Sequence, residues 1–426
     1  MLLSRLLNRL IQYGDLTVID AHGRRHRFGG RPIEDLPAAL APPPVTIRLH
    51  DPALHWRMVT STHLATGEAF MNGTLTVEDG GTLYDFLALA VYNMARSPGQ
   101  WAVDAQHRLN RALRWLHQHN PMPRAQANVA HHYDLSGALY DLFLDADRQY
   151  SCAYFPTGGE TLEEAQEAKK RHIAGKLLLR PGHRVLDIGS GWGGMALYLA
   201  GEHDCTVEGV TLSREQLALA RDRARAAGLS GRVEFFLRDY RYHSGRYDRI
   251  VSVGMFEHVG VNHYDEFFGK VHELLADDGV ALLHTIGRAS PPGGTNAWLR
   301  KYIFPGGYTP ALSEVMAAVE RSGLKVTDVE VLRHHYADTL RAWRQRFMAN
   351  RDRAVALYDE RFARMWEFYL AGCEAVFRFD DQVVFQVQLA RRNDVVPTTR
   401  DYITAFDRRR HLKVIPPQDT GKAAAE

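Results

Sequence analysis

Short apolar segments alternate with amphipathic segments through the second half of this chain. Short runs rich in Val, Ile, Leu and Phe are typical of buried strands, and segments with apolar residues three and four positions apart are typical of helices. Such alternation predicts a parallel sheet whose strands are joined by helical crossovers. The strands are expected at 184–188, 205–211, 232–237, 247–253 and 279–285, and the helices near 193–203, 213–228 and 264–276.

Two more apolar segments, 324–332 and 382–391, complete a predicted seven-stranded sheet of Rossmann-like α/β type. A helical insertion at about 337–378 separates these last two strands. Large apolar side chains recur in it at helical spacing, and such a stripe is more often core than a ligand groove. We therefore expect these side chains to form core. They are Trp343, Phe347, Trp366, Phe368, Tyr369 and Phe377.

The N-terminal part, residues 1–120, is expected to form a smaller α+β domain. Strand-like runs at 16–20 and 45–49 precede helical patterns at 82–95 and 99–118. The segment 67–73 lies between them, and we interpret it as an ordinary turn, with a functional loop as the alternative. The chain thus divides into a domain at 1–120, a larger domain at 121–395 and a C-terminal tail at 396–426.

Both ends of the chain are basic. The leucines of segment 2–11 share one helical face, and Arg5 and Arg9 lie on the other. Two placements fit this pattern: flat on an anionic membrane surface, or docked on its own domain. The tail after about 410 ends in Pro416-Pro-Gln-Asp-Thr-Gly-Lys-Ala-Ala-Ala-Glu426, and we expect it to be disordered.

The run Val185-Leu-Asp-Ile-Gly-Ser-Gly-Trp-Gly-Gly194 has the form of a strand that ends in a glycine-rich turn and opens a helix. A side chain at Gly189, Gly191 or Gly194 would keep the backbone from closing the turn or approaching a ligand. The helix that follows offers unpaired N–H groups. The run therefore predicts a nucleotide cradle, and its glycine spacing also fits dinucleotide-binding domains.

The neighbouring acids favour S-adenosylmethionine over a nicotinamide dinucleotide. A dinucleotide site needs an acid at the tip of the second strand, whereas Glu208 falls inside the run 205–211. Asp187 lies two residues before the first glycine of the turn, where methyltransferases place a carboxylate near the methionyl part of the cofactor. We therefore expect a class I methyltransferase domain, and a dehydrogenase is the alternative.

Composition restricts the remaining classes. The 426 residues contain no apolar run long enough to span a bilayer and no signal-peptide core at the N-terminus, so we expect a cytosolic protein. Three widely spaced cysteines fit a reducing compartment. A net charge of +2 is too small to indicate a nucleic-acid partner. The 21 histidines lack metal-ligand spacing, so no metal site is expected.

Seven segments of the larger domain are distinctive: His131-His-Tyr-Asp-Leu135, Gln149-Tyr-Ser-Cys-Ala-Tyr154, the 185–194 run, Gly209-Val-Thr-Leu-Ser-Arg-Glu-Gln216, Val251-Ser-Val-Gly-Met-Phe-Glu-His-Val-Gly260, Leu283-His-Thr-Ile-Gly287 and Lys301-Tyr-Ile-Phe-Pro305. Together they resemble the cyclopropane-fatty-acyl-phospholipid synthases, S-adenosylmethionine-dependent enzymes related to the mycolic acid cyclopropane synthases. The first domain resembles the N-terminal extension of bacterial members.

The resemblance implies methylene transfer from S-adenosylmethionine to the cis double bond of an unsaturated acyl chain in a membrane phospholipid. In this family a carbocation left by methyl transfer is thought to lose a proton to bound bicarbonate before the ring closes. A backbone N–H, an imidazole and a phenol can donate to bicarbonate, and a carboxylate can accept its proton. The implied bicarbonate site comprises Cys152, Glu257, His284, Ile286 through its backbone, and Tyr336.

The same segments imply the cofactor contacts. Thr211 stands where most class I methyltransferases have an acid, so Gln216 is the expected partner of the ribose hydroxyls. The full set comprises Tyr150, Ser151 and Asp187 toward the methionyl end, Gly189 and Gly191 under the sulfonium, Thr211, Leu212 and Gln216 at the ribose, and Asp239 and Tyr240 beside the adenine.

Structural explanations stand beside these roles: Glu257 as a helix cap, His284 as a core histidine and Cys152 as a small buried residue. The surroundings of Tyr336 also depart from the family's usual pattern. Two other functions stay open: C-methylation of acyl chains without ring closure, and membrane binding by a protein with an inactive methyltransferase domain. We further expect a homodimer at the inner face of the membrane, with docking or dimerisation carried by the N-terminal domain.

Overall fold

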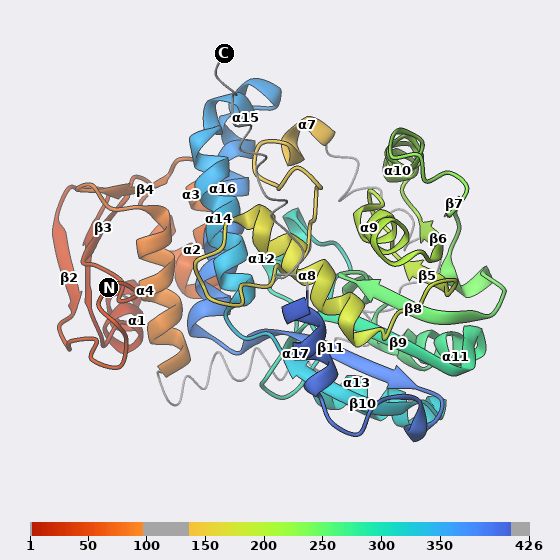
Figure 1. The fold of residues 1–426 in the computed structure, drawn as a ribbon. Helices are drawn as coiled ribbons and strands as arrows, with labels where there is room; N and C mark the ends of the chain where they lie inside the picture. Colours follow the sequence, from red (N-terminus) through yellow and green to blue (C-terminus); the bar gives the residue numbers. More distant parts are fainter. Residues whose placement is uncertain (1, 97–135, 410–426) are drawn as a thin grey trace, which may run out of the picture.

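The computed structural model describes residues 2–96 and 136–409. A seven-stranded sheet lies at the centre of the larger part, with helices on both faces (Figure 1). Its strand order is β10-β11-β9-β8-β5-β6-β7, which confirms the predicted α/β class and strand number. The strands are β5 (Arg184–Ile188), β6 (Thr206–Thr211), β7 (Val233–Leu237), β8 (Tyr247–Val253), β9 (Leu275–Arg288), β10 (Lys325–Val331) and β11 (Gln382–Ala390).

The sheet is parallel from β7 to β9, and β11 runs against both of its neighbours. The five strands from which a parallel sheet was predicted are parallel, and the direction of β11 was not predicted. Because β11 pairs with β9 from Gln382↔Arg288 to Ala390↔Val280, β9 extends beyond the predicted 279–285. An apolar run marks a strand but carries no signal of its direction, which depends on where the preceding helix ends.

Successive side chains of the strands enter opposite cores. Val185 packs with helices α8 (Leu162–Lys176), α9 (Gly194–His203) and α10 (Arg214–Ala226), whereas Leu186 packs with α11 (Tyr264–Leu274) and α13 (Leu312–Ser322). This alternation is expected of a strand buried on both faces. The three predicted crossover helices are confirmed as α9, α10 and α11, and α8 and α13 were not predicted.

The predicted insertion consists of three helices, α14 (His335–Ala349), α15 (Arg351–Leu357) and α16 (Glu360–Phe379). The expectation that its aromatic side chains form core is confirmed. Trp343, Phe347 and Trp366 are buried in one apolar cluster. The ring of Phe143, from the segment before β5, lies 6.0 Å from that of Trp343 and 5.8 Å from that of Trp366.

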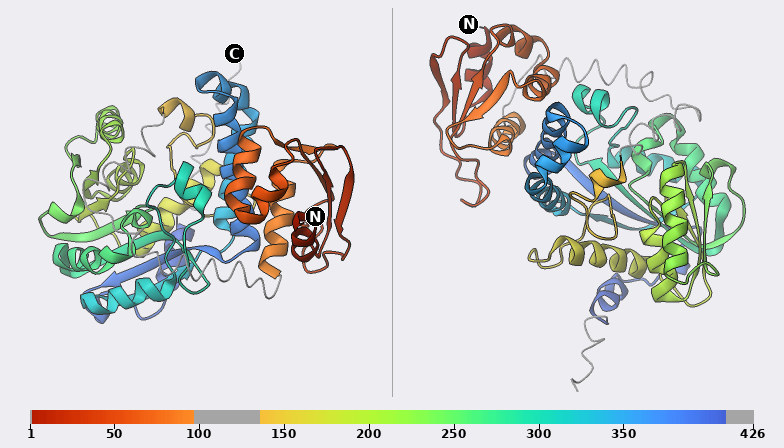
Figure 2. Two further views of the ribbon diagram at one scale, coloured as in Figure 1. Left: turned by 180° about the vertical axis from the view of Figure 1, so that it is seen from behind. Right: turned by 90° about the horizontal axis from the view of Figure 1, so that it is seen from above.

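The N-terminal part is an α+β unit with a four-stranded sheet of order β2-β1-β3-β4, and its helices α3 (Thr62–Met71) and α4 (Leu83–Arg96) pack on α16 (Figure 2). β2 and β4 were not predicted. In β2 the sequence Arg25-His-Arg-Phe-Gly29 has no apolar alternation. The helix predicted at 99–118 lies outside the described residues. The elements are α1 (Leu2–Leu10), β1 (Asp15–Ile19), β2 (Arg25–Gly29), β3 (Val45–Leu49), α2 (Leu54–Thr60), α3 (Thr62–Met71), β4 (Leu75–Glu78) and α4 (Leu83–Arg96).

The structure also places the first helix of the chain and the beginning of the predicted C-terminal tail. Leu3, Leu7 and Leu10 of α1 are buried in the core of their own unit, which favours the docked placement of this helix. Within the predicted tail, α17 (Asp401–Arg409) packs on α8. None of the helices in 2–96 and 136–409 is long and apolar enough to cross a membrane.

The segment 67–73 is not the turn that was predicted, because most of it belongs to α3. Gly67 lies against the indole of Trp298 on α12 (Ala297–Tyr302). The next residue, Glu68, reaches the same helix, where its Oε1 accepts from Lys301 Nζ at 2.7 Å and from Tyr302 Oη at 2.9 Å. This segment therefore joins the N-terminal unit to the larger domain.

Gly67→Ala is expected to destabilise the protein by about 1–3 kcal/mol, because the added methyl group overlaps the Trp298 ring and the helices must separate. Gly269→Ala is the matched control, since this glycine of α11 faces open space and alanine favours helix by about 1 kcal/mol. Thermal unfolding of both variants tests the contact. An unchanged melting temperature for Gly67→Ala would contradict a close-packed junction.

Candidate active site

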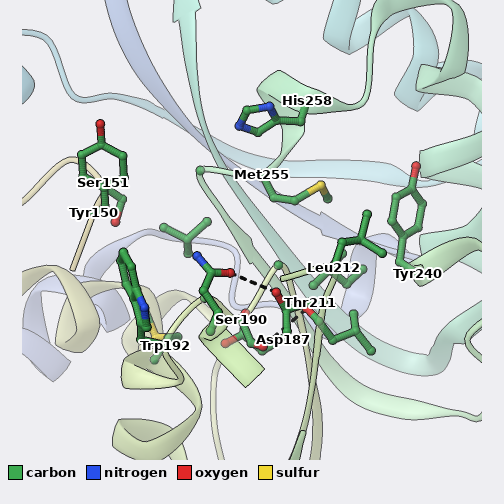
Figure 3. A pocket seen from close by; sticks show the side chains of 18 of the residues that line it. Tyr150, Ser151, Asp187, Ser190, Trp192, Thr211, Leu212, Tyr240, Met255 and His258 are labelled. Carbon is green, nitrogen blue, oxygen red and sulfur yellow. Dashed lines mark hydrogen bonds between the residues drawn. The ribbon is translucent and has the colours of Figure 1, made fainter. Parts of the chain in front are cut away.

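A cavity of about 1170 Å³, open mouth included, lies at the carboxyl ends of β5, β6 and β8. This is the edge at which open α/β sheets bind their ligands. Figure 3 shows Tyr150, Ser151, Asp187, Thr211 and Tyr240 around this common space. All ten predicted cofactor residues line it: Tyr150, Ser151, Asp187, Gly189, Gly191, Thr211, Leu212, Gln216, Asp239 and Tyr240.

The glycine turn lines the cavity. Its backbone takes a conformation that residues other than glycine avoid. Gly189 has φ +83°, and its N–H donates to the Val210 carbonyl oxygen at 3.0 Å. A Cβ there would come within 2.7 Å of the Met255 side chain, which lines the same cavity. The absence of a side chain at 189 thus keeps the turn closed and the cavity open.

Asp187 is buried at the end of β5, and its Oδ2 has no hydrogen-bond partner among the described residues. Burial raises the pKa of this carboxyl to about 7, and the nearby charge of Lys169 acts in the opposite direction. A buried acceptor without a donor is costly, so it marks a place for a polar or cationic ligand group. This geometry fits the role predicted for Asp187.

The ribose and adenine residues are arranged by contacts among themselves. Thr211 Oγ1 donates to Gln216 Oε1 at 3.0 Å. This bond uses the oxygen of the Gln216 amide and not its N–H groups. Asp239 is held by Arg241, whose Nε and Nη2 donate to its two oxygens at 2.9 and 2.6 Å. The ring of Tyr240 packs edge-on against Phe267 at 5.3 Å. A neutral amide and an aromatic ring suit hydroxyl groups and a flat base.

Glu257 lies just beyond β8, in a short 3-10 helix formed by Phe256–His258. Its Oε1 accepts from the backbone N–H of Ile286 at 2.6 Å, and its Oε2 is buried and has no partner in the part of the chain that the structure describes. Burial raises the pKa of the Glu257 carboxyl to about 7. One carboxylate oxygen is thus anchored, and the other is available to a bound group.

His284 lies on the adjacent strand β9, opposite the end of β8, where its carbonyl oxygen accepts from Gly254 N–H at 2.9 Å. Gln386 Nε2 on β11 lies 3.1 Å from His284 Nδ1, and His284 Nε2 is buried with no partner in the described residues. Burial holds the pKa of this imidazole well below its usual range, so the ring is neutral. With Nδ1 accepting from Gln386, the proton is on Nε2.

The other three predicted bicarbonate residues belong to a single apolar cluster. Burial raises the pKa of the Cys152 thiol, which donates to the Ala153 carbonyl oxygen at 3.2 Å. The ring of Tyr336 lies 4.7 Å from that of Phe377. Ile286 gives its N–H to Glu257, so this N–H positions the carboxylate instead of being available to an anion.

Sequence reasoning missed several residues that line the cavity. Met255 and His258 flank Phe256–Glu257 in a segment already recognised as distinctive, and this position after a strand was the available signal. Burial lowers the pKa of His258 to about 4, so this imidazole is also neutral. Gln149 and Trp192 line the cavity as well, and neither carried a signal of its own.

The comparisons with known proteins agree with this site. The family model for mycolic acid cyclopropane synthetase matches residues 120–387. A probable fatty acid methyltransferase of Pseudomonas putida is 39% identical over 348 residues, which cover 79% of this chain and 84% of that protein. A cyclopropane-fatty-acyl-phospholipid synthase of Escherichia coli K12 is 38% identical over 350 residues, which cover 82% and 88%.

A solved structure shows the same arrangement. The crystal structure of the mycolic acid cyclopropane synthase CmaA1, complexed with SAH and CTAB, matches this fold with a TM-score of 0.60 at 37% identity. The match covers 63% of this chain and 98% of that chain. It therefore extends over nearly the whole of a related enzyme and over about two thirds of this chain.

Proposed function

The chain belongs to the mycolic acid cyclopropane synthetase family and is an S-adenosylmethionine-dependent methyltransferase, and from this premise we propose that it adds a methylene group across the cis double bond of unsaturated phospholipid acyl chains. One observation carries the proposal. Glu257 Oε2 and His284 Nε2 are both buried and unpaired among the described residues; neither residue lines the cofactor cavity itself, but Met255 and His258, on either side of Phe256–Glu257, do. Methyl transfer alone does not need such a pair, whereas the removal of a proton does.

Bound S-adenosylmethionine supplies an electrophilic methyl group. An alkene is a weak nucleophile, so this chain's own residues must hold the two reactants at near-attack distance and exclude water. The glycine turn and Asp187 fix one end of the cofactor space. Tyr150, which lines that space, stacks on Trp343 at 5.2 Å and packs against a buried aromatic cluster beside it.

The buried pair fits bicarbonate, which when bound would supply the base that takes a proton from the substrate cation. His284 presents Nε2–H as a donor, and ionised Glu257 presents Oε2 as an acceptor. One donor and one acceptor together match an anion that has both acceptor oxygens and an O–H. Two ionised carboxylates at this place would exclude an anion, but the second polar group is a neutral imidazole.

Incubation of the purified protein with S-adenosylmethionine and unsaturated phospholipid vesicles tests the proposal. Each modified chain is expected to gain the mass of one methylene group and to lose its olefinic signal. Omission of bicarbonate under carbon-dioxide-free conditions is expected to slow the reaction. Modified chains that retain the double bond would overturn cyclopropane formation.

A second candidate is C-methylation of unsaturated acyl chains without ring closure. It is favoured by the similarity to the probable fatty acid methyltransferase of Pseudomonas putida, which is as high as that to the cyclopropane synthase. Both reactions share the methyl transfer and differ in which proton leaves. A methyl-branched chain that keeps a double bond, or a chain with a methylene branch, in the vesicle experiment would establish this candidate instead.

Gln386 is a positioning residue in this proposal, because its amide fixes which nitrogen of His284 carries the proton. Gln386→Leu is expected to lower turnover about 10- to 100-fold and to leave S-adenosylhomocysteine affinity unchanged. Gln388→Leu is the matched control, since this buried glutamine lies on the same face of β11 and bonds Tyr402 Oη at 2.7 Å instead. Equal loss of turnover in both variants would show a general effect on the strand.

We also propose that the protein acts as a homodimer at the inner face of the membrane, with the N-terminal domain at the lipid surface. Trp56 on α2 is 60% exposed, and Arg24, Arg25 and Arg27 are exposed on or beside β2. Exposed aromatic and basic side chains suit an anionic interface. Flotation with anionic and neutral vesicles tests the surface, and light scattering tests the dimer.

A further inference from the structure

Lys169 on α8 is completely buried, and it has no carboxylate within ion-pair distance among the described residues. Its Nζ donates to Gln149 Oε1 at 2.6 Å and to Ser151 Oγ at 2.8 Å. A buried ammonium group whose partners are both neutral is costly to the fold. Its position directly behind two cavity-lining residues suggests a role at the cavity.

Helix α8 holds the segment 149–151 from behind. Gln166, one helical turn before Lys169, donates its Nε2 to the carbonyl oxygens of Gln149 and Ser151 at 3.1 and 3.0 Å. Two side chains of one helix thus make four hydrogen bonds to this short segment. The contacts set the orientation of both side chains that flank Tyr150 in the cavity wall.

The contact with Lys169 determines what Ser151 can offer to a ligand. A hydroxyl that accepts from an ammonium group has its own proton left to donate. Gln149 also accepts from Lys169 at its Oε1, and one of its two amide N–H groups donates to Asp147 Oδ2 at 3.0 Å. Ser151 therefore presents a donor with a positive charge behind it, which favours an anionic acceptor.

Asp187 supplies the complementary group in the same cavity. The unpaired Oδ2 of Asp187 can accept a hydrogen bond from a ligand, and the Ser151 hydroxyl can donate one. A ligand group that carries both an ammonium and a carboxylate satisfies the two at once. The amino-acid end of S-adenosylmethionine is such a group.

We propose that Lys169 is a positioning residue that directs the Ser151 hydroxyl, and a positive potential, at the carboxylate of the cofactor's methionyl group. The proposal rests on the cofactor part of the proposed function and not on the acyl-chain reaction. It assigns the recognition of the carboxylate to a buried cation outside the cavity wall, which acts through Ser151.

Calorimetric binding of two ligands tests this assignment: S-adenosylhomocysteine, which has the amino-acid end, and 5′-methylthioadenosine, which lacks it. Lys169→Met is expected to weaken S-adenosylhomocysteine binding about 10- to 100-fold and to change methylthioadenosine binding less than about threefold. Lys169→Arg is expected to restore part of the loss. Lys176→Met, at another fully buried lysine of α8 that pairs with Glu330, is the control and should affect neither ligand.

The pH dependence gives a second readout. Burial lowers the pKa of Lys169 to about 8, so S-adenosylhomocysteine binding to the wild type is expected to weaken as the pH rises above about 8. Lys169→Arg should abolish this dependence, because arginine stays charged. The charged and titratable groups that face Lys169 are Asp145 and Asp147 from the preceding segment, Lys170 from α8, Cys152, Asp187 from β5 and His284 from β9.

Equal weakening of both ligands in Lys169→Met would show a merely structural role, and no weakening would show no role. If Lys169→Met does not fold, Ser151→Ala takes its place, and it must show the same selective loss of S-adenosylhomocysteine affinity. Ligand selectivity does not depend on the lipid product. A vesicle reaction without cyclopropane would therefore overturn the proposed function and leave this inference standing.

Discussion

Glu257→Gln is expected to lower turnover on unsaturated phospholipid vesicles by about 100- to 1000-fold while S-adenosylhomocysteine affinity stays within about twofold. Glutamine retains the size of the side chain and can still accept from the Ile286 N–H at Oε1. It replaces the unpaired Oε2 acceptor with an N–H donor. Steady-state kinetics and calorimetry on the same preparation measure the two effects separately.

The pH profile gives an independent check on Glu257. Because burial raises its pKa to about 7, kcat at saturating cofactor is expected to rise as the pH increases through about 7, where the carboxylate becomes ionised. Glu257→Gln should lose this limb. Saturating cofactor matters here, since the pKa of Asp187 is also raised to about 7 and would otherwise add its own dependence.

Stability is expected to move in the opposite direction from activity. The folded-state pKa of Glu257 lies above its ordinary value of 4.5, so the stabilising effect of its protonated form is present at low pH and is lost as the pH rises through about 7. Glu257→Gln should therefore melt no lower than the wild type at about pH 8. Equal loss of turnover and cofactor affinity, with a lower melting temperature, would show that Glu257 is structural.

The elements that could be predicted are those whose burial is marked by an apolar run in the sequence. β5 and β8 have the residue bounds expected, because each is an apolar run buried on both faces of the sheet. β2 was missed because its arginines face solvent on an outer strand. The direction of β11 was not predicted, because it depends on the path of α16 and not on its own residues.

The candidate site shows the same division. Glu257 and His284 could be placed at one sheet edge, since each stands at the end of a predicted strand or just beyond it. Lys169 could not, because α8 carries lysines and a histidine that are typical of an exposed helix but lie buried. Whether a cation faces water or a neutral hydroxyl is decided by tertiary packing, which no local pattern contains.

Gly189→Val is expected to weaken S-adenosylhomocysteine binding at least about 100-fold, or about 2.7 kcal/mol. Two costs combine at this position. The backbone at φ +83° disfavours a β-branched residue by at least about 1–2 kcal/mol, and the new Cβ would lie 2.7 Å from the nearest atoms of the Met255 side chain. The second cost falls on the cavity itself, because Met255 lines it and must move into the cofactor space or away from β8.

Gly182→Val separates these two costs. Gly182 has nearly the same backbone, with φ +82°, but a Cβ there meets nothing within 4 Å, and the residue does not line the cavity. Both variants should therefore lose stability through the backbone, with the larger loss in Gly189→Val, while only Gly189→Val loses S-adenosylhomocysteine affinity. Thermal unfolding and calorimetry of the pair measure each quantity. Equal loss of affinity would trace the effect to backbone strain in the fold, and retained affinity in Gly189→Val would remove the glycine turn from the cofactor site.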